Sequence, residues 1–176
     1  MIESLRLKTL ISEADIQKRI AEMGESLTDR FKGQDLVAVC ILKGSFIFFS
    51  DLIRAIDTDL KCEFLGLSSY GDQMSSTGEV KLTMDIANSL EGRHVLIVED
   101  IVDSGLTMDY IQKILDIRKP KSITTVSLLQ KPDAKKVDYQ LDMVGFKIPN
   151  DFVVGYGLDY QNHYRHLPYI AQVELN

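Results

Sequence analysis

The segment from residue 94 to 111 (HVLIVEDIVDSGLTMDYI) places acidic side chains directly before a stretch that suits an anion. Its apolar first half is typical of a buried strand, and its periodic second half predicts a helix that begins near Leu106. The first backbone N–H groups of a helix lack partners within the helix, and the helix dipole is positive at that end. A phosphate fits there, because Gly105 permits close approach and Ser104 and Thr107 supply hydroxyl donors. The P-loop pattern GxxxxGK[ST] is absent from the sequence.

The carboxylates Glu99, Asp100 and Asp103 must serve another part of such a ligand, because like charges repel. Carboxylates accept hydrogen bonds from sugar hydroxyls, and carboxylate oxygens are ligands that Mg²⁺ prefers. Phosphate, hydroxyls and a divalent cation occur together in a ribose phosphate. The sequence therefore predicts a ribose phosphate site. Taken singly, each acidic residue could instead be structural, with Asp103 as an ordinary helix N-cap.

The elements that position this segment follow from periodicity. Apolar residues from Ile16 to Phe31 recur every three or four positions, which predicts an amphipathic helix capped by Ser12 and Asp15. Strands are predicted at 35–42, 62–70, 80–86, 94–100 and 122–129, and further helices at 46–56 and from 106 to Lys119-Pro120. The segment 71–79 is small and polar, a composition typical of a lid loop.

Alternation of strands and helices predicts an α/β fold with an open, mostly parallel sheet flanked by helices. Ligands of such sheets bind beyond the carboxyl ends of the strands. This rule places Lys43, the loop 99–107, Lys131 and Asp159 on one rim. We expect a single domain, residues 1–176, with a core at about 36–130. Residues 1–35 and 131–176 are expected to form a small hood above the rim.

The composition is that of an ordinary globular chain of 176 residues with a net charge of −6. Nucleic-acid binders are usually basic, so we expect no nucleic-acid partner. We expect no membrane partner either, because no stretch approaches the ~18 uninterrupted apolar residues of a spanning helix. Cys40 and Cys62 have no CxxC spacing, and the sequence starts without an apolar leader. Both features predict a cytoplasmic protein with reduced thiols.

The stretch VLIVEDIVDSGLT closely resembles the phosphoribosyl-pyrophosphate (PRPP) signature of type I phosphoribosyltransferases. The stretches at 42–45 (LKGS), 68–80 (SSYGDQMSSTGEV) and 148–170 (IPNDFVVGYGLDYQNHYRHLPYI) resemble hypoxanthine-guanine phosphoribosyltransferases of the compact bacterial type. The resemblance implies the fold of that family and a homodimer or homotetramer. It also implies purine salvage by Mg²⁺-dependent transfer of the 5-phosphoribosyl group from PRPP to N9 of hypoxanthine and guanine. The products would be IMP or GMP and pyrophosphate.

The resemblance further implies a role for each residue of the site. Asp103 would be the catalytic residue, facing N7 of the purine as a general base. PRPP would be bound by Lys43, Gly44, Glu99, Asp100, Ile101, Val102, Asp103, Ser104, Gly105, Leu106, Thr107 and Arg165. Lys131, Phe152 and Val153 would bind the purine, Ser69 and Tyr70 would close over it, and Glu99, Asp100 and Asp159 would hold Mg²⁺. In this family the peptide bond at the position of Leu42–Lys43 is often cis.

Three other interpretations stay open. Lys131 suits a 6-oxo group and disfavours the amino group of adenine, but it does not separate hypoxanthine and guanine from xanthine. A xanthine-preferring enzyme is therefore an alternative. A non-catalytic PRPP-sensing regulator is another, although such regulators usually carry a DNA-binding segment and a basic surface. A receiver-type domain with a carboxylate–Mg²⁺ site would leave Lys131 and Phe152-Val153 unexplained.

Overall fold

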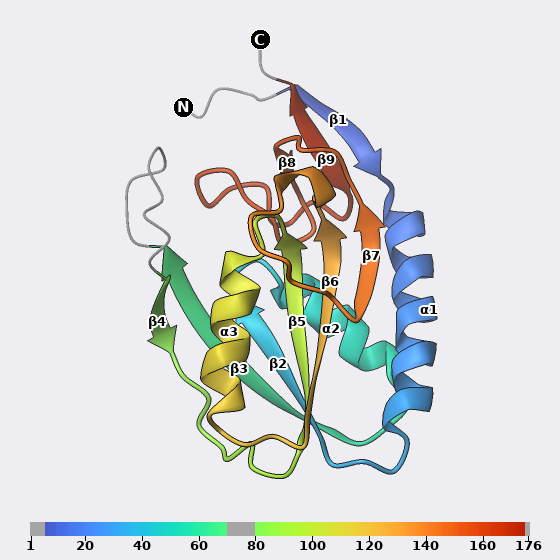
Figure 1. Cartoon of the computed structure of the whole chain (residues 1–176). Helices are drawn as coiled ribbons and strands as arrows, with labels where there is room; N and C mark the ends of the chain where they lie inside the picture. Colours follow the sequence, from blue (N-terminus) through green and yellow to red (C-terminus); the bar gives the residue numbers. More distant parts are fainter. Residues whose placement is uncertain (1–5, 70–79, 175–176) are drawn as a thin grey trace.

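The computed structural model describes residues 6–69 and 80–174. A six-stranded sheet in the order β4-β3-β2-β5-β6-β7 forms the body of the molecule, and only the pairing of β3 with β4 is antiparallel (Figure 1). Its strands are β2 (Leu36–Leu42), β3 (Leu60–Ser69), β4 (Val80–Met84), β5 (His94–Val102), β6 (Ser122–Gln130) and β7 (Met143–Lys147). The predicted α/β class with a mostly parallel sheet is confirmed.

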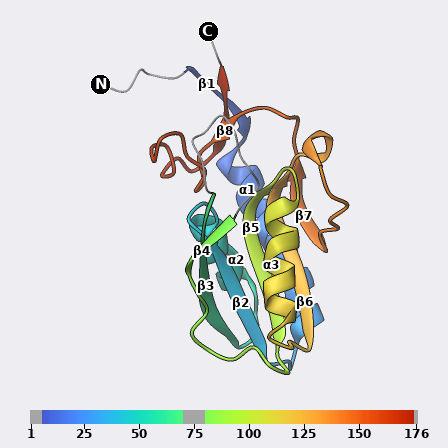
Figure 2. The same cartoon turned by 60° about the vertical axis from the view of Figure 1, so that its left-hand side comes forward.

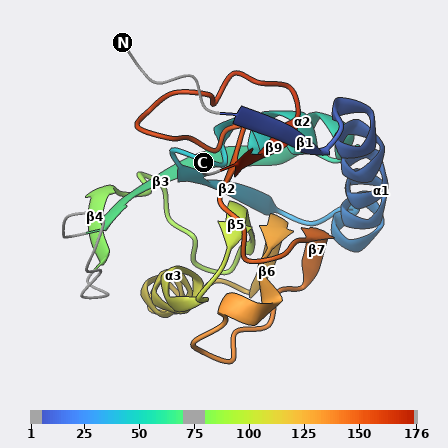
Figure 3. The same ribbon diagram turned by 90° about the horizontal axis from the view of Figure 1, so that it is seen from above.

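Helices cover both faces of this sheet. Helices α1 (Glu13–Phe31) and α2 (Phe46–Ala55) lie on one face and α3 (Leu106–Asp116) on the other, as the view from above shows (Figure 3). A short 3₁₀ turn at Pro132–Ala134 follows β6. The predicted cap of α1 is present, since the amide of Asp15 donates to Ser12 Oγ at 3.2 Å.

Burial on both faces explains the unbroken apolar runs of the central strands. Alternate residues of β2 enter two separate clusters: Ala38 and Cys40 pack toward α1 and α2, whereas Val37 and Val39 pack toward α3. The sheet is thus held rigid from both sides, and its carboxyl ends are left to carry the site.

A second, three-stranded sheet lies at the carboxyl ends of the first and forms the hood (Figures 1 and 2). It consists of β1 (Arg6–Ile11), β9 (Ile170–Glu174) and β8 (Val153–Val154), in that order. The expected hood segments included α1 and β7, whereas both pack with the larger sheet. The hood seen here is therefore smaller than residues 1–35 and 131–176. That the chain is one domain stays a prediction.

Several element limits differ from the predictions. Strand β5 extends past its predicted end at residue 100 to Val102, and α3 ends at Asp116, before Lys119 adopts a φ of 54°. Strands β1, β7, β8 and β9 were not predicted. The expected lid at 71–79 lies outside the described residues. Among the described residues, no helix is long and apolar enough to cross a membrane.

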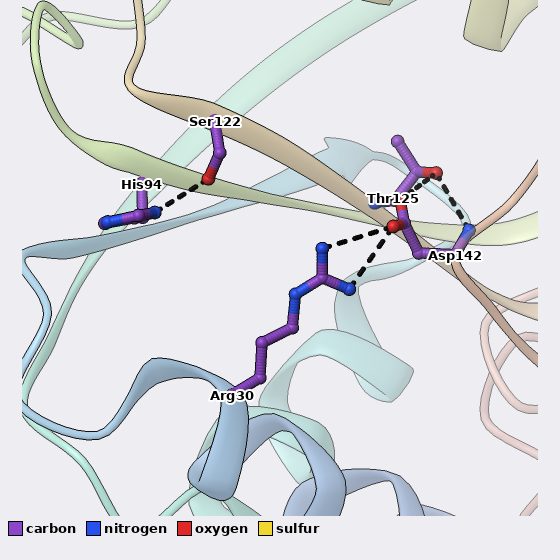
Figure 4. Close-up of polar contacts among 5 residues, drawn as sticks. All are labelled: Arg30, His94, Ser122, Thr125 and Asp142. Atoms are coloured by element: carbon purple, nitrogen blue, oxygen red, sulfur yellow. Dashed lines mark hydrogen bonds and ion pairs between the residues drawn. The ribbon is translucent and has the colours of Figure 1, made fainter.

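A polar clamp at Asp142 joins α1, β6 and the start of β7 (Figure 4). Its Oδ2 accepts hydrogen bonds from the amide of Thr125 at 2.8 Å and from Thr125 Oγ1 at 3.2 Å. Its Oδ1 faces both terminal nitrogens of Arg30, at 3.2 and 3.3 Å. In a separate contact, His94 Nδ1 lies 2.7 Å from Ser122 Oγ and links the first residues of β5 and β6 (Figure 4). These contacts fix the edge of the sheet that bears β7.

Candidate active site

A cavity of about 700 Å³ lies where the hood meets the carboxyl ends of the main strands. Residues of the main sheet and of the hood line it together: Lys43, Gly44, Leu67, Ser68, Asp100, Ile101, Asp103, Lys131, Phe152, Val153, Leu158, Asp159, Asn162 and Arg165. The predicted rim residues Lys43, Lys131 and Asp159 are therefore brought together, as the strand-end rule requires.

The loop after β2 brings main-chain groups into the cavity. The Leu42–Lys43 peptide bond is cis, as the family resemblance implied. A Cβ on Gly44 would fall 1.5 Å from Asp100 Oδ2, so only glycine permits this approach. The loop backbone and the Asp100 carboxylate therefore form one continuous wall.

Two adjacent carboxylates end the apolar part of β5. Glu99 is buried, and its Oε1 accepts the amide hydrogen of Asp100 at 3.1 Å. Burial raises the pKa of Glu99 well above its ordinary value, and the neighbouring Asp100 adds to the rise. Burial also raises the pKa of Asp100. An acidic pair that loses hydration in this way is stabilised by a cation or by hydroxyl donors.

After these carboxylates, β5 leads through a turn into α3, which is the predicted strand–turn–helix arrangement. Asp103 is exposed and accepts the amide hydrogen of Ser104. Gly105 has a φ of 80° and forms the N-cap of α3, where its carbonyl accepts from the amide of Asp109 at 3.0 Å. The N-terminus of α3 thus faces the same edge as the cavity, which suits an anion. Of the residues in this segment that were predicted to bind PRPP, Asp100, Ile101 and Asp103 line the cavity. Glu99, Val102, Ser104, Gly105, Leu106 and Thr107 are not among its lining residues.

The three predicted purine residues also line the cavity. Lys131 follows β6, and its amide donates to the carbonyl of Val102 at 2.9 Å. The Phe152 ring is 48% exposed and meets Tyr160 edge-on, with 5.9 Å between ring centroids. The buried Val153 comes next. An exposed ring, a lysine and strand-end backbone groups can bind a planar heterocycle.

Asp159 and Arg165 form the outer rim. Arg165 Nη2 lies 2.6 Å from Asp159 Oδ1, and its Nη1 donates to the carbonyl of Gly157 at 2.6 Å. The amide of Asn162 donates to Asp159 Oδ2 at 2.7 Å. In the described part of the chain, no three His, Cys, Asp or Glu residues gather into a metal-binding group. Mg²⁺ usually takes only one or two carboxylates and completes its shell with water and substrate oxygens, so the pair Glu99–Asp100 and the single Asp159 fit it.

Of the lid pair, Ser69 ends β3, and Tyr70 lies outside the described residues. Sequence reasoning missed other cavity residues, namely Leu67, Ser68, Leu158 and Asn162. Ser68, Leu158 and Asn162 stand inside the stretches that carried the family resemblance, so that signal could have included them.

The family model for the phosphoribosyl transferase domain matches residues 9–161. The chain therefore belongs to the phosphoribosyltransferase family. It is 50% identical to the hypoxanthine-guanine phosphoribosyltransferase of Bacillus subtilis over 93% of this chain and 91% of that protein. It is 46% identical to the hypoxanthine phosphoribosyltransferase of Escherichia coli K12, over 96% of both chains. A crystal structure of a hypoxanthine phosphoribosyltransferase from Staphylococcus aureus superposes with a TM-score of 0.92 at 45% identity, covering 99% of this chain and 97% of that one.

Proposed function

We propose that this transferase acts in purine salvage, transferring the 5-phosphoribosyl group of PRPP to N9 of hypoxanthine and guanine. The products are IMP or GMP and pyrophosphate. One observation carries the proposal: a single cavity joins Asp100 and Asp103, at the carboxyl end of β5, to Lys131 and Phe152. The names of the similar proteins from Bacillus subtilis and Escherichia coli support the same substrates.

Different residues bind the different chemical groups of PRPP. The N-terminus of α3 binds the 5′-phosphate, with Ser104 and Thr107 as hydroxyl donors. Glu99 and Asp100 accept hydrogen bonds from the ribose hydroxyls. The backbone of Lys43 and Gly44, with the Arg165 guanidinium, binds pyrophosphate. Mg²⁺ held by Glu99 and Asp100, and a second ion at Asp159, would add positive charge at the phosphates.

The chain's own groups then assist bond cleavage at C1 of the ribose. Positive charge develops on the ribose ring and negative charge on the departing pyrophosphate, which Arg165 and the loop at 43–44 stabilise. Asp103 takes the proton from N7 as N9 attacks. Water would intercept the ribose cation, so Ser69 and Tyr70 close over the site as a lid.

Lys131 and Phe152 select the base. The lysine ammonium donates to the 6-oxo oxygen of hypoxanthine or guanine, where adenine presents a second donor. The exposed Phe152 ring stacks on the purine, and backbone groups at Val153 meet its edge.

A spectrophotometric assay with PRPP and Mg²⁺ tests the function against hypoxanthine, guanine, xanthine and adenine separately. We expect product from hypoxanthine and guanine and none from adenine. Product from xanthine alone would favour the xanthine-preferring alternative. PRPP binding by calorimetry without product from any base would favour a PRPP sensor.

We also propose that the chain is a cytoplasmic homo-oligomer. Cys40 and Cys62 are both free thiols, as suits a reducing compartment. Phe46 on α2 and Phe64 on β3 are each 43% exposed. They lie on the same side of the sheet, where the ring centroids of Phe64 and Phe49 are 5.8 Å apart. An apolar patch of this kind marks an association surface, and we assign it to a second copy of the chain.

A further inference from the structure

A buried tyrosine of the hood is tied to a helix of the main body. Tyr156 lies two residues beyond β8, is 3% exposed and has a φ of 49°. Its hydroxyl donates a hydrogen bond to Asp51 Oδ2 on α2, 105 residues away in the sequence. Neither residue lines the cavity, so neither takes part in binding or chemistry directly.

Asp51 joins three parts of the molecule. Gln17 Nε2 on α1 donates to the same oxygen at 3.2 Å, and Arg54 pairs with the other oxygen. The Asp51 side chain is only 17% exposed, whereas that of Arg54 is 72% exposed. The contact of Asp51 with Tyr156 is thus shielded from solvent. The ion pair with Arg54 is solvated, and solvated ion pairs contribute little to stability.

Gly157, the residue after Tyr156, connects this contact to the site. The amide of Gly157 donates to the carbonyl of Arg165 at 2.9 Å, and Arg165 Nη1 returns a hydrogen bond to the Gly157 carbonyl at 2.6 Å. On its other side, Gly157 packs on the pyrophosphate loop: a Cβ there would fall 2.0 Å from the Gly44 carbonyl oxygen. Gly157 therefore lies between the two groups that the proposed function assigns to pyrophosphate.

A buried hydroxyl needs a partner, and a carboxylate is a strong one. Burial and the Asp51 carboxylate both raise the pKa of Tyr156, so the phenol stays protonated and keeps donating. Phenylalanine would fill the same space. If Tyr156 served packing alone, its hydroxyl would be dispensable. The hydroxyl instead fixes where the turn at 155–158 meets α2.

We propose that Tyr156 and Asp51 are a pair of positioning residues that hold the turn at 155–158 against Gly44 and thereby place Arg165 and Asp159 for pyrophosphate. This inference rests on the proposed function, because it assigns the pair to PRPP and not to the purine. Lys131 follows β6 and Phe152 precedes β8, so we expect the pair to affect purine binding less than PRPP binding.

The test uses Tyr156→Phe, Asp51→Ala and the double variant of the full chain, with Arg54→Gln as the matched control on the same carboxylate. We expect each single variant to raise the KM for PRPP about tenfold, the factor that loss of one hydrogen bond to a charged group can produce. The KM for hypoxanthine should change less than about twofold. The double variant should resemble the singles, because two residues that act through one contact are not additive. Arg54→Gln should leave both constants at the wild-type value.

Two further readouts separate positioning from folding. Calorimetry with pyrophosphate and Mg²⁺ should show weaker binding in both variants, and melting curves should show that both remain folded. An unchanged KM for PRPP in Tyr156→Phe, additive effects in the double variant, or equal losses for PRPP and hypoxanthine would overturn the proposal. Unfolding of both single variants would also overturn it, by making the contact a requirement of folding. Failure of the proposed function would appear separately, as a wild-type protein that forms no nucleotide.

Discussion

Asp103 is an exposed carboxylate on the cavity wall, on the first turn after β5. We expect Asp103→Asn to lower kcat by about 10²-fold or more, because an amide cannot accept the N7 proton in the transition state. The KM for PRPP should stay within about twofold, since backbone and hydroxyl groups bind the phosphate. Steady-state kinetics check both values. The exposed Asp138→Asn is a control, and equal losses in turnover and PRPP binding would refute the general-base role.

Glu99 gives a prediction about pH, also at the scale of one residue. Its pKa is raised, so the folded chain binds this proton more tightly than the unfolded chain does. The stability that Glu99 contributes is therefore complete below the ordinary glutamate pKa and is lost as the pH rises through the raised one. Glutamine has no such loss. In metal-free buffer at pH 8, we expect Glu99→Gln to have a higher Tm than the wild type. The increase should be about 2–4 °C for each kcal/mol of folding free energy that the wild type loses by ionising Glu99.

The same difference in Tm should shrink toward zero near about pH 4, where both chains carry a neutral side chain at this position. Calorimetric or spectroscopic melts at the two pH values measure it. The exposed Glu91→Gln is a matched control, with no change in Tm at either pH. A lower Tm for Glu99→Gln at pH 8, or a shift that is the same at both pH values, would contradict the argument.

At the scale of elements, the Asp142 clamp predicts where the fold can be weakened without touching the site (Figure 4). Asp142→Ala leaves the Thr125 amide and hydroxyl without their acceptor, which we expect to cost about 1–3 kcal/mol. Chemical denaturation measures this loss. Arg30→Gln removes only the partly exposed ion pair, so its cost should stay below about 1 kcal/mol. Equal losses in the two variants would show that the ion pair, and not the amide contact, carries the clamp.

The elements also show which parts of the fold a sequence can predict. Strands β2 and β5 are buried on both faces, and each contains an unbroken apolar run. Strand β6 is buried as well, but Thr124, Thr125 and Ser127 interrupt its apolar residues. Strand β7 is an edge strand of intermediate burial, and its Gly145 packs directly over the Leu128 carbonyl. Its sequence therefore contains no continuous apolar run that would identify it as a strand. Strands β1 and β9 come from opposite ends of the sequence, and their pairing aligns Arg6 with Glu174. Most residues of β1 are exposed, so the strand has no apolar pattern that would predict this pairing.

At the scale of the whole molecule, the same division applies to the site. The residues after β5 are consecutive, so their type and order predicted an anion-binding turn beside an acidic pair. The strand-end rule also placed Lys131 on the rim. Phe152 and Arg165 are single residues on separate segments, and only the family resemblance indicated that they join the site. The contact between Tyr156 and Asp51 depends on how the hood rests on α2. No local pattern predicts it, because it arises from the tertiary fold.

The exposed apolar side chains of α2 and β3 lead to a prediction about assembly. Phe46 and Phe64 are each 43% exposed, and Met84 on the neighbouring strand is 50% exposed beside Gly66. In a two-fold symmetric interface each copy presents the same patch, so one substitution places two charges in it. We expect Phe64→Glu to convert the wild-type oligomer into a smaller species, measured by light scattering after size-exclusion chromatography. Ile117→Glu is the control, because Ile117 is 79% exposed beyond α3, away from this patch. A monomeric wild type, or an equal shift in both variants, would remove the assignment of this surface to a second copy.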